Sequence, residues 1–101
     1  MFRHGIMAKD KILYHKYLIL KSIPAYGKNS NRVLCAIISS KMTNFCVQIK
    51  GKDNFLGYVQ LDNLHTIRLQ DIPDDINLES LRKDKVSECM NKFKAFIKSF
   101  I

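Results

Sequence analysis

The sequence predicts an α+β fold in which a β-rich body, about residues 11–70, is followed by one C-terminal helix, about residues 78–100. Two observations predict it. Four apolar segments of strand length, separated by Gly, Pro, Asn and Asp, fill the first part of the chain. Later in the chain the apolar residues recur every three or four positions, which is the period of an amphipathic helix. With 101 residues, the chain is predicted to form a single domain.

The predicted strands are residues 11–20, 32–39, 45–50 and 57–70. The second, RVLCAIIS, is almost continuously apolar, as is expected of a strand that is buried on both faces. The fourth, GYVQLDNLHTIRLQ, is long and is predicted to break near Asp62 and Asn63, because both residues favour turns. The connections SIPAYGKNSN, GKDN and IPDD are predicted to be a polar loop, a hairpin turn and the end of the β-rich body.

The helix is predicted to begin at Asn77, whose side chain can cap the first free N–H groups. Acidic residues precede and open this segment and lysines lie near its end, which suits the helix dipole. Its apolar stripe is expected to pack against the sheet rather than to bind a partner.

The net charge of +8 is concentrated in one half of the chain. Residues 1–52 hold ten of the 17 Lys and Arg residues but only one acid, Asp10. Such a concentration favours binding of RNA or DNA, although it is equally compatible with an ordinary solvated surface. The chain has no apolar run of membrane-spanning length and no secretory signal, so no membrane association and a cytoplasmic location are expected. The three cysteines have no disulfide or zinc spacing and are expected to be buried, reduced thiols.

The histidines and cysteines show no metal-binding spacing, and the four glycines are scattered singly, so neither a metal nor another cofactor is expected. A polar set nevertheless lies on the basic β-rich body: His15, Lys16, Ser39, Ser40, Lys41, His65 and Thr66. This set suits RNA cleavage by the RNA's own 2′-hydroxyl, which needs a proton acceptor, a proton donor and cations beside the phosphate. Each residue also has an ordinary structural interpretation, as an exposed strand residue, a strand end or a hydrogen-bonded core histidine.

The order of these segments resembles the MazF/PemK family of toxin endoribonucleases, over about Tyr14 to Ile101. That family has an RPVLVIS-like strand, a variable loop, a strand ending in APIT or AAIT, an HVEI-like strand, the motif VxLDQIRTIDxxRL and a C-terminal helix. Here the corresponding segments are HKYLILKS, VLCAIISS, FCVQI, GYVQLDNLHTIRLQDI and the final helix. The best match is VQLDNLHTIRLQDI, and the evidence is the order and spacing of the segments rather than one specific motif.

The resemblance implies a small SH3-like β-barrel with a C-terminal helix, usually a homodimer, which cleaves single-stranded RNA without a metal and is inhibited by a cognate antitoxin peptide. Family catalysis depends on the arginine that opens the RP strand and on the threonine of IT. These positions fall on His15 and Ser39, with Lys16 at the proline position, so the three are the implied catalytic residues. The implied RNA-binding residues are Lys21, Lys28, Arg32, Ser40, Lys41 and His65.

Three departures from the family pattern keep an alternative open. His15 and Lys16 replace a bidentate arginine, which a lysine point charge does not reproduce. His65 replaces the arginine of RTI, and only 14 residues precede His15, so HGIM would be a remnant of the family's first strand. The alternatives are therefore a weakened or inactive module that binds RNA or an antitoxin and, less favoured, an interaction protein whose basic half meets an acidic partner.

Overall fold

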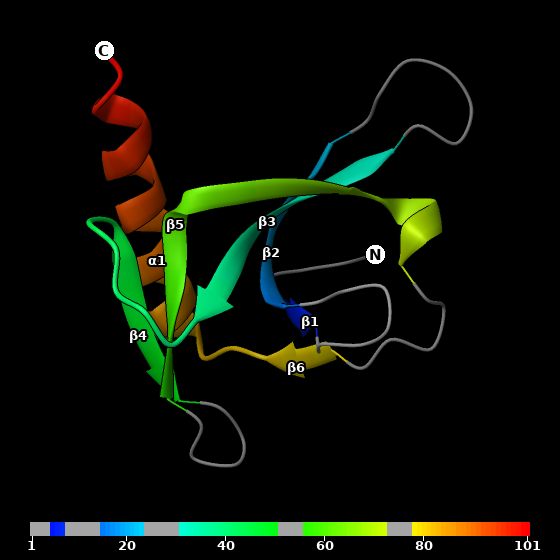
Figure 1. Cartoon of the computed structure of the whole chain (residues 1–101), viewed down its shortest axis with the longest axis horizontal. Coiled ribbons are helices and arrows are strands. Elements are labelled where there is room, and N and C mark those ends of the chain that lie inside the picture. Colours follow the sequence, from blue (N-terminus) through cyan, green and yellow to red (C-terminus); the bar gives the residue numbers. More distant parts are fainter. Residues whose placement is uncertain (1–4, 8–14, 24–30, 51–55, 73–77) are drawn as a thin grey trace.

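The structure is a computed structural model that describes residues 5–7, 15–23, 31–50, 56–72 and 78–101. It contains six strands, one short 3-10 helix and one α-helix (Figure 1). Their bounds are β1 Gly5–Met7, β2 Lys16–Ile23, β3 Arg32–Ser39, β4 Cys46–Lys50, β5 Leu56–Arg68, η1 Leu69–Asp71, β6 Leu78–Ser80 and α1 Lys83–Lys98. The predicted α+β class, a β-rich body followed by a C-terminal helix, is confirmed.

The six strands form one antiparallel sheet in the order β4-β5-β3-β2-β1-β6. The sheet curls into a half-barrel, with β4 and β6 as its two terminal strands (Figure 1). Within the segment HGIM, residues Gly5–Met7 form the strand β1, and His4 lies outside the described residues. The predicted loop at residues 22–31 begins too early, because Ser22 and Ile23 belong to β2 and pair with β3. Residues 24–30 of that loop and the predicted hairpin turn at residues 51–54 lie outside the described residues.

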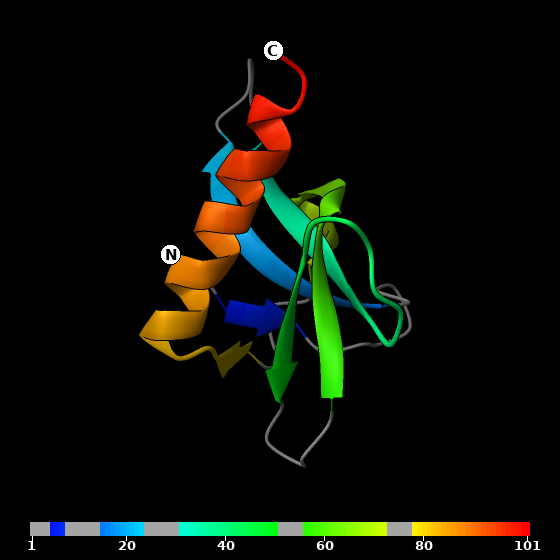
Figure 2. The same ribbon diagram turned by 90° about the vertical axis from the view of Figure 1, so that its left-hand side faces the viewer.

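Side chains alternate between the two faces of the sheet, and both faces carry an apolar cluster. One cluster contains Leu18, Ala36, Val59 and Leu61 and is covered by α1 through Cys89 (Figure 2). We call this the helix face. The cluster on the opposite face contains Tyr17, Ile19, Val33, Cys35, Ile37 and Ile72, and we call it the open face. The continuous apolar run of β3 is thus explained, because its side chains are buried in both clusters.

The helix begins later than the sequence pattern predicts. Residues 78–80 are the strand β6, in which Leu78 and Ser80 pair with Met7 and Gly5 of β1. The backbone edge of β1 supplies hydrogen-bond partners that the local periodicity does not reveal. Arg82 then precedes the helix in an extended conformation without a side-chain cap, and the predicted cap, Asn77, lies outside the described residues. The predicted packing of the apolar stripe is confirmed in part: Cys89, Met90 and Phe93 contact the helix-face cluster, whereas Ile97 and Phe100 are exposed.

Strand β5 contains the main irregularity of the sheet. Ala36 pairs with Leu64, but its neighbour Ile37 pairs with Gln60, so three residues of β5, Leu61 to Asn63, have no partner on β3. The predicted break near Asp62 and Asn63 is therefore a bulge within one continuous strand.

Among the described residues, no helix has both the length and the apolar character that crossing a membrane requires.

Candidate functional site

Two histidines flank one tyrosine on the open face of the sheet. The ring centroids of His15 and Tyr17 lie 6.3 Å apart, and those of Tyr17 and His65 lie 6.0 Å apart, both in edge-to-face geometry. The pairing of His65 with Cys35 places it on the open face beside Tyr17, and His15 precedes β2. Tyr17 is 9% exposed whereas both histidines are exposed, so the histidines can reach a ligand while the tyrosine supports them.

Ser39 reaches the same face at the end of β3. It is half-buried and follows Cys35 and Ile37 in the strand alternation, opposite Tyr58 of β5. Its Oγ accepts a hydrogen bond from the backbone N–H of Lys41 at 3.2 Å, which tightens the turn that follows the strand. The hydroxyl hydrogen remains available for a second partner, such as a phosphate oxygen.

A chain of hydrogen bonds connects this turn to His65. The buried side chain of Gln60 donates from Nε2 to the carbonyl oxygen of Lys41 at 3.0 Å. Its Oε1 accepts from Asn63 Nδ2 at 3.0 Å, and Asn63 Oδ1 lies 3.3 Å from His65 Nε2. We call this chain the amide relay. It exists because the bulge in β5 brings Asn63 back over Gln60.

The amide relay determines which nitrogen of a neutral His65 carries hydrogen. The Lys41 carbonyl can only accept, so Gln60 must present its nitrogen there and its oxygen to Asn63. Asn63 then donates to Gln60 and is left with its own oxygen facing His65. Because that oxygen also can only accept, His65 Nε2 carries the hydrogen and Nδ1 keeps the lone pair.

Asp62, which lies in the bulge, also holds the turn after β3 through its carboxylate. One carboxylate oxygen accepts from the Thr43 hydroxyl, and the other accepts from the backbone N–H of Phe45 at 3.3 Å. The backbone N–H of Leu61 also donates to the Phe45 carbonyl at 2.8 Å. The segment SSKMTN, residues 39–44, is therefore held in place by Gln60 and Asp62 of one strand.

The remaining predicted residues are spread over the molecule. Lys16 pairs with Ile38, a helix-face residue, so it lies on the face of the sheet opposite His15 and Ser39. Arg32 begins β3 and is about 23 Å from Ser39 along the strand, at about 3.3 Å per residue. Lys21 pairs with Leu34 and lies toward the same far end of the sheet.

Ser40 and Lys41, both exposed, follow Ser39 directly in the turn. Thr66 is exposed and pairs with Leu34, whereas Lys28 lies outside the described residues. The structure thus groups His15, Ser39, Lys41 and His65 around Tyr17 and the amide relay, and it separates Lys16, Lys21 and Arg32 from them.

The sequence pattern did not assign Tyr17, Gln60 or Asn63 to the candidate site. Tyr17 is one aromatic residue in an apolar strand, and Gln60 alternates with buried residues as any outward-facing polar residue would. The available signal was the pair Asp62-Asn63 in the middle of a strand pattern, because a bulge often positions side chains beside a functional site.

The buried groups of the open face are unreactive. Burial raises the pKa of the Cys35 thiol to about 12, so this cysteine is not a nucleophile near neutral pH. Burial, with a smaller contribution from Cys35, raises the pKa of the Tyr17 phenol above its ordinary value of 10.0. Tyr17 therefore presents a neutral ring between the two histidines.

All three cysteines are free; Cys35 and Cys89 are buried as predicted, and Cys46 is half-buried.

Within the described parts of the chain, no three His, Cys, Asp or Glu side chains come close enough to share a metal ion.

Comparison with solved structures identifies a similar fold. No protein-family model matches the sequence, and no curated protein matches it. An endoribonuclease solved in complex with its cognate antitoxin, from a mycobacterial species, superimposes with a TM-score of 0.66 at 13% sequence identity. The match covers 97% of this chain and 95% of that one. This chain, with its curled antiparallel sheet and C-terminal helix, therefore shares the fold of that endoribonuclease.

Proposed function

We propose that this chain is a metal-independent endoribonuclease of the MazF/PemK type, which cleaves single-stranded RNA as the toxin of a type II toxin–antitoxin pair. The observation that carries the proposal is the grouping of His15, His65 and Ser39 on one face of a sheet that has an endoribonuclease's fold. Two imidazoles can serve as the proton acceptor and the proton donor of RNA cleavage by transesterification, and a hydroxyl can donate a hydrogen bond to the phosphate.

In the proposed reaction the 2′-oxygen of the RNA forms a bond to phosphorus as the bond from phosphorus to the 5′-oxygen breaks. His65 accepts the 2′-hydroxyl proton at Nδ1, the nitrogen that the amide relay leaves with a lone pair. His15, as imidazolium, donates a proton to the departing 5′-oxygen. The products are a 2′,3′-cyclic phosphate and a free 5′-hydroxyl.

Charge that develops on the phosphate is stabilised by the Ser39 hydroxyl and the Lys41 ammonium group. Both come from the turn that Gln60 and Asp62 hold in place. The alternation of side chains along β2 favours Lys41 over Lys16 for this role, because Lys16 lies on the opposite face of the sheet.

The test is cleavage of a long single-stranded RNA by purified protein in EDTA. We expect His15→Ala and His65→Ala to lower the rate by roughly 10²- to 10⁴-fold. We expect Ser39→Ala to lower it about tenfold, the effect of one lost hydrogen bond to a charged group. Lys94→Ala, which removes an exposed lysine of α1 far from this face, is the matched control and should cut at the wild-type rate.

A second readout does not depend on activity. Nitrogen chemical shifts of the histidine side chains should show neutral His65 as the tautomer with hydrogen on Nε2. Asn63→Leu removes the acceptor and should yield a tautomer mixture and a slower reaction with unchanged RNA affinity. A wild-type His65 with hydrogen on Nδ1 would contradict its assignment as the base.

The alternative is a module on the same fold that binds RNA or an antitoxin without cutting. It is favoured by one observation: His15 stands where the family has its catalytic arginine, and Arg32 lies at the far end of β3. RNA binding without cleavage in the EDTA assay would support this alternative.

The proposed partners are single-stranded RNA, a cognate antitoxin peptide and a second copy of the chain, in the cytoplasm. The antitoxin proposal is supported by the solved endoribonuclease, whose structure is a complex with its cognate antitoxin. The homodimer proposal is supported by exposed apolar side chains near the end of the chain, including Ile97 and Phe100, and is tested by light scattering.

A further inference from the structure

A row of open-face side chains crosses the sheet from the proposed active site to β4. Ser39 pairs with Tyr58 of β5, and Tyr58 pairs in turn with Gln48 of β4. Directly paired residues of antiparallel strands share one face of the sheet, so the open face that carries Ser39 also carries Tyr58 and Gln48. His15 lies beside Ser39 at the other end of the row, because the first residue of β2 pairs with the last but one of β3.

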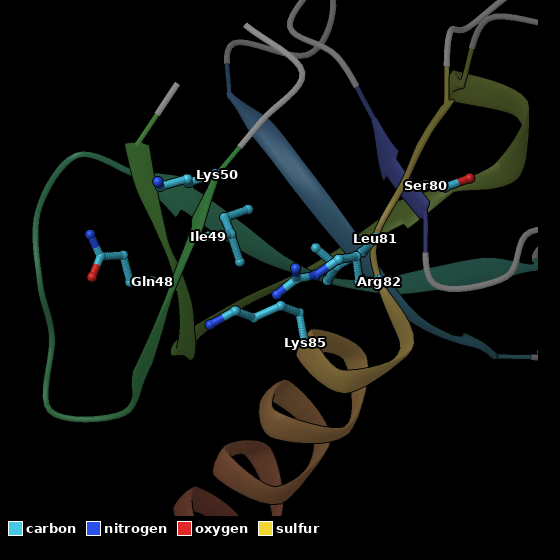
Figure 3. Close-up of a pocket in the computed structure, with 7 residues that line it drawn as sticks. All are labelled: Gln48, Ile49, Lys50, Ser80, Leu81, Arg82 and Lys85. Atoms are coloured by element: carbon cyan, nitrogen blue, oxygen red, sulfur yellow. The ribbon is translucent and has the colours of Figure 1, made fainter. Parts of the chain in front are cut away.

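The row is accessible from the open face. Figure 3 shows the side chains of Gln48 and Lys50 on one side of β4 and the side chain of Ile49 on the other, toward the start of α1. Ile49 belongs to the helix-face cluster, so Gln48 and Lys50 face away from that cluster. Both are exposed, whereas Tyr58 is half-buried and, among the described residues, belongs to neither apolar cluster. The Tyr58 ring therefore lies outside the core packing and can contact a ligand.

The turn at residues 39–44 borders the row on one side. Figure 2 shows α1 on one side of β4 and β5 and this turn on the other, so the turn crosses β5 over the open face. It is held there by Gln60, which donates to the Lys41 carbonyl and is the next open-face residue of β5 after Tyr58. The position of Tyr58 relative to Ser39 is therefore fixed both by strand pairing and by this turn.

The spacing of the row suits one nucleotide of single-stranded RNA. Neighbouring strands lie about 4.8 Å apart, so Ser39 and Gln48, which are two strands apart, are separated by about 10 Å. A nucleotide whose phosphate contacts Ser39 can lay its base over the Tyr58 ring, since aromatic side chains stack on every kind of base. The Gln48 amide, which offers both donor and acceptor groups, then lies at the edge of the base. The three residues thus match the phosphate, the flat face and the edge of one nucleotide.

We propose that Tyr58 and Gln48 form the binding site for the RNA base next to the cleaved phosphate. Tyr58 stacks on that base and supplies affinity, Gln48 hydrogen-bonds to its edge and supplies base preference, and Lys50 contacts the neighbouring phosphate. This inference rests on the proposed RNA cleavage, because the phosphate at Ser39 sets the position of the base. Neither Tyr58 nor Gln48 is among the catalytic or RNA-binding residues that the family resemblance implies.

The test measures binding apart from cleavage, with fluorescein-labelled RNA hexamers whose 2′-O-methyl groups prevent cutting. Four homopolymers carry A, C, G or U, and a fifth chain of the same charge carries no bases. Fluorescence anisotropy should show that the wild type binds its preferred homopolymer about tenfold more tightly than the chain without bases. Tyr58→Leu should remove most of this preference, and Tyr58→Phe should keep it. Phe100→Leu, which removes an exposed ring beyond the end of α1, is the matched control and should bind like the wild type.

Variants of β4 separate recognition of the base edge from attraction by charge. Gln48→Leu should bring the four homopolymers to within about twofold of one another, and Asn91→Leu, which removes an exposed amide of α1, is its control. Lys50→Ala should weaken all five chains by a similar factor and lower the slope of log affinity against log salt by about one. Affinity for the chain without bases should be unchanged in Tyr58→Leu and Gln48→Leu, which shows that these variants are folded.

Three outcomes separate this inference from the proposed function. A wild type that binds no homopolymer better than the chain without bases would overturn the base site. An unchanged base preference in Tyr58→Leu and Gln48→Leu would also overturn it, and cleavage of unmodified RNA by these variants would leave the proposed function intact. Binding that depends on Tyr58 and Gln48, without any cleavage of unmodified RNA by the wild type, would support the base site and refute the nuclease.

Discussion

Asp62 is expected to be a main determinant of stability for the turn at residues 39–44. Its carboxylate accepts from the Thr43 hydroxyl and the Phe45 N–H, and hydrogen bonds to charged groups contribute about 1.5–3 kcal/mol each when buried. Because Asp62 is half-buried, about 1 kcal/mol for each bond is the better value. Asp62→Ala should therefore lower the free energy of unfolding by about 2 kcal/mol, and Tm by about 8 °C for a chain of this length.

Graded variants make this prediction sharper. Asp62→Asn keeps one acceptor and should cost about 1 kcal/mol, and so should Thr43→Val. The double variant Asp62→Ala with Thr43→Val should be no less stable than Asp62→Ala alone, because the hydroxyl has already lost its acceptor. In urea denaturation the double variant should therefore lose about 1 kcal/mol less than the sum of the two single losses. Glu88→Ala is the control: its exposed carboxylate forms an ion pair with Lys85, and the change should alter stability by less than about 0.5 kcal/mol. The assigned role of Asp62 would be refuted if Asp62→Ala lowered the free energy of unfolding no more than Glu88→Ala does. It would also be refuted if the losses from Asp62→Ala and Thr43→Val simply added in the double variant.

Three further predictions concern buried groups. At pH 8 a disulfide reagent should label Cys46 first, because burial raises the pKa of Cys35 and Cys89 to about 12; equal rates for all three in the native protein would contradict this. Stability should fall as pH rises from about 9 toward 12, since unfolded thiols release protons that the folded thiols keep. In urea denaturation, Cys35→Ala should lose less stability over this pH range than the wild type does, and the difference should be up to about 1.4 kcal/mol per pH unit. Phe96→Ala should cost about 2 kcal/mol in the same assay, because the half-buried Phe96 ring lies 5.4 Å from the Phe45 ring; a loss below about 0.5 kcal/mol would show that this contact is not stabilising.

The strands could be predicted from the sequence because their signals are local. The apolar run RVLCAIIS predicts a buried strand at residues 32–39, and β3 has the same bounds, Arg32–Ser39. The end of the helix was equally readable, since it depends on residues within the helix. Its start was not, because Leu78 to Ser80 pair with β1, more than seventy residues earlier in the chain.

The candidate site was predictable only in part. Residue chemistry and family resemblance nominated His15, Ser39 and His65, and the sheet register places them on one face. The same reasoning grouped Lys16 with them, although strand alternation puts it on the opposite face. Tyr17 and Gln60 were missed because their roles arise from contacts across three strands, which no spacing within one segment can express.

The bulge in β5 also affects how the chain can vary in length. Val59 and Leu61 point into the helix-face cluster before the bulge, but Leu64 points there after it. The residues of β5 that face this cluster therefore have odd numbers before the bulge and an even number after it. Deleting one residue between Leu61 and Leu64 would restore a single parity through the strand. Leu64 would then continue the alternation of Val59 and Leu61 and would still point toward α1, while His65 and Ile67 would stay on the open face. Deleting both Asp62 and Asn63 would instead turn His65 and Ile67 toward α1 unless a bulge remained. Homologous chains that lack the bulge should therefore be shorter here by an odd number of residues.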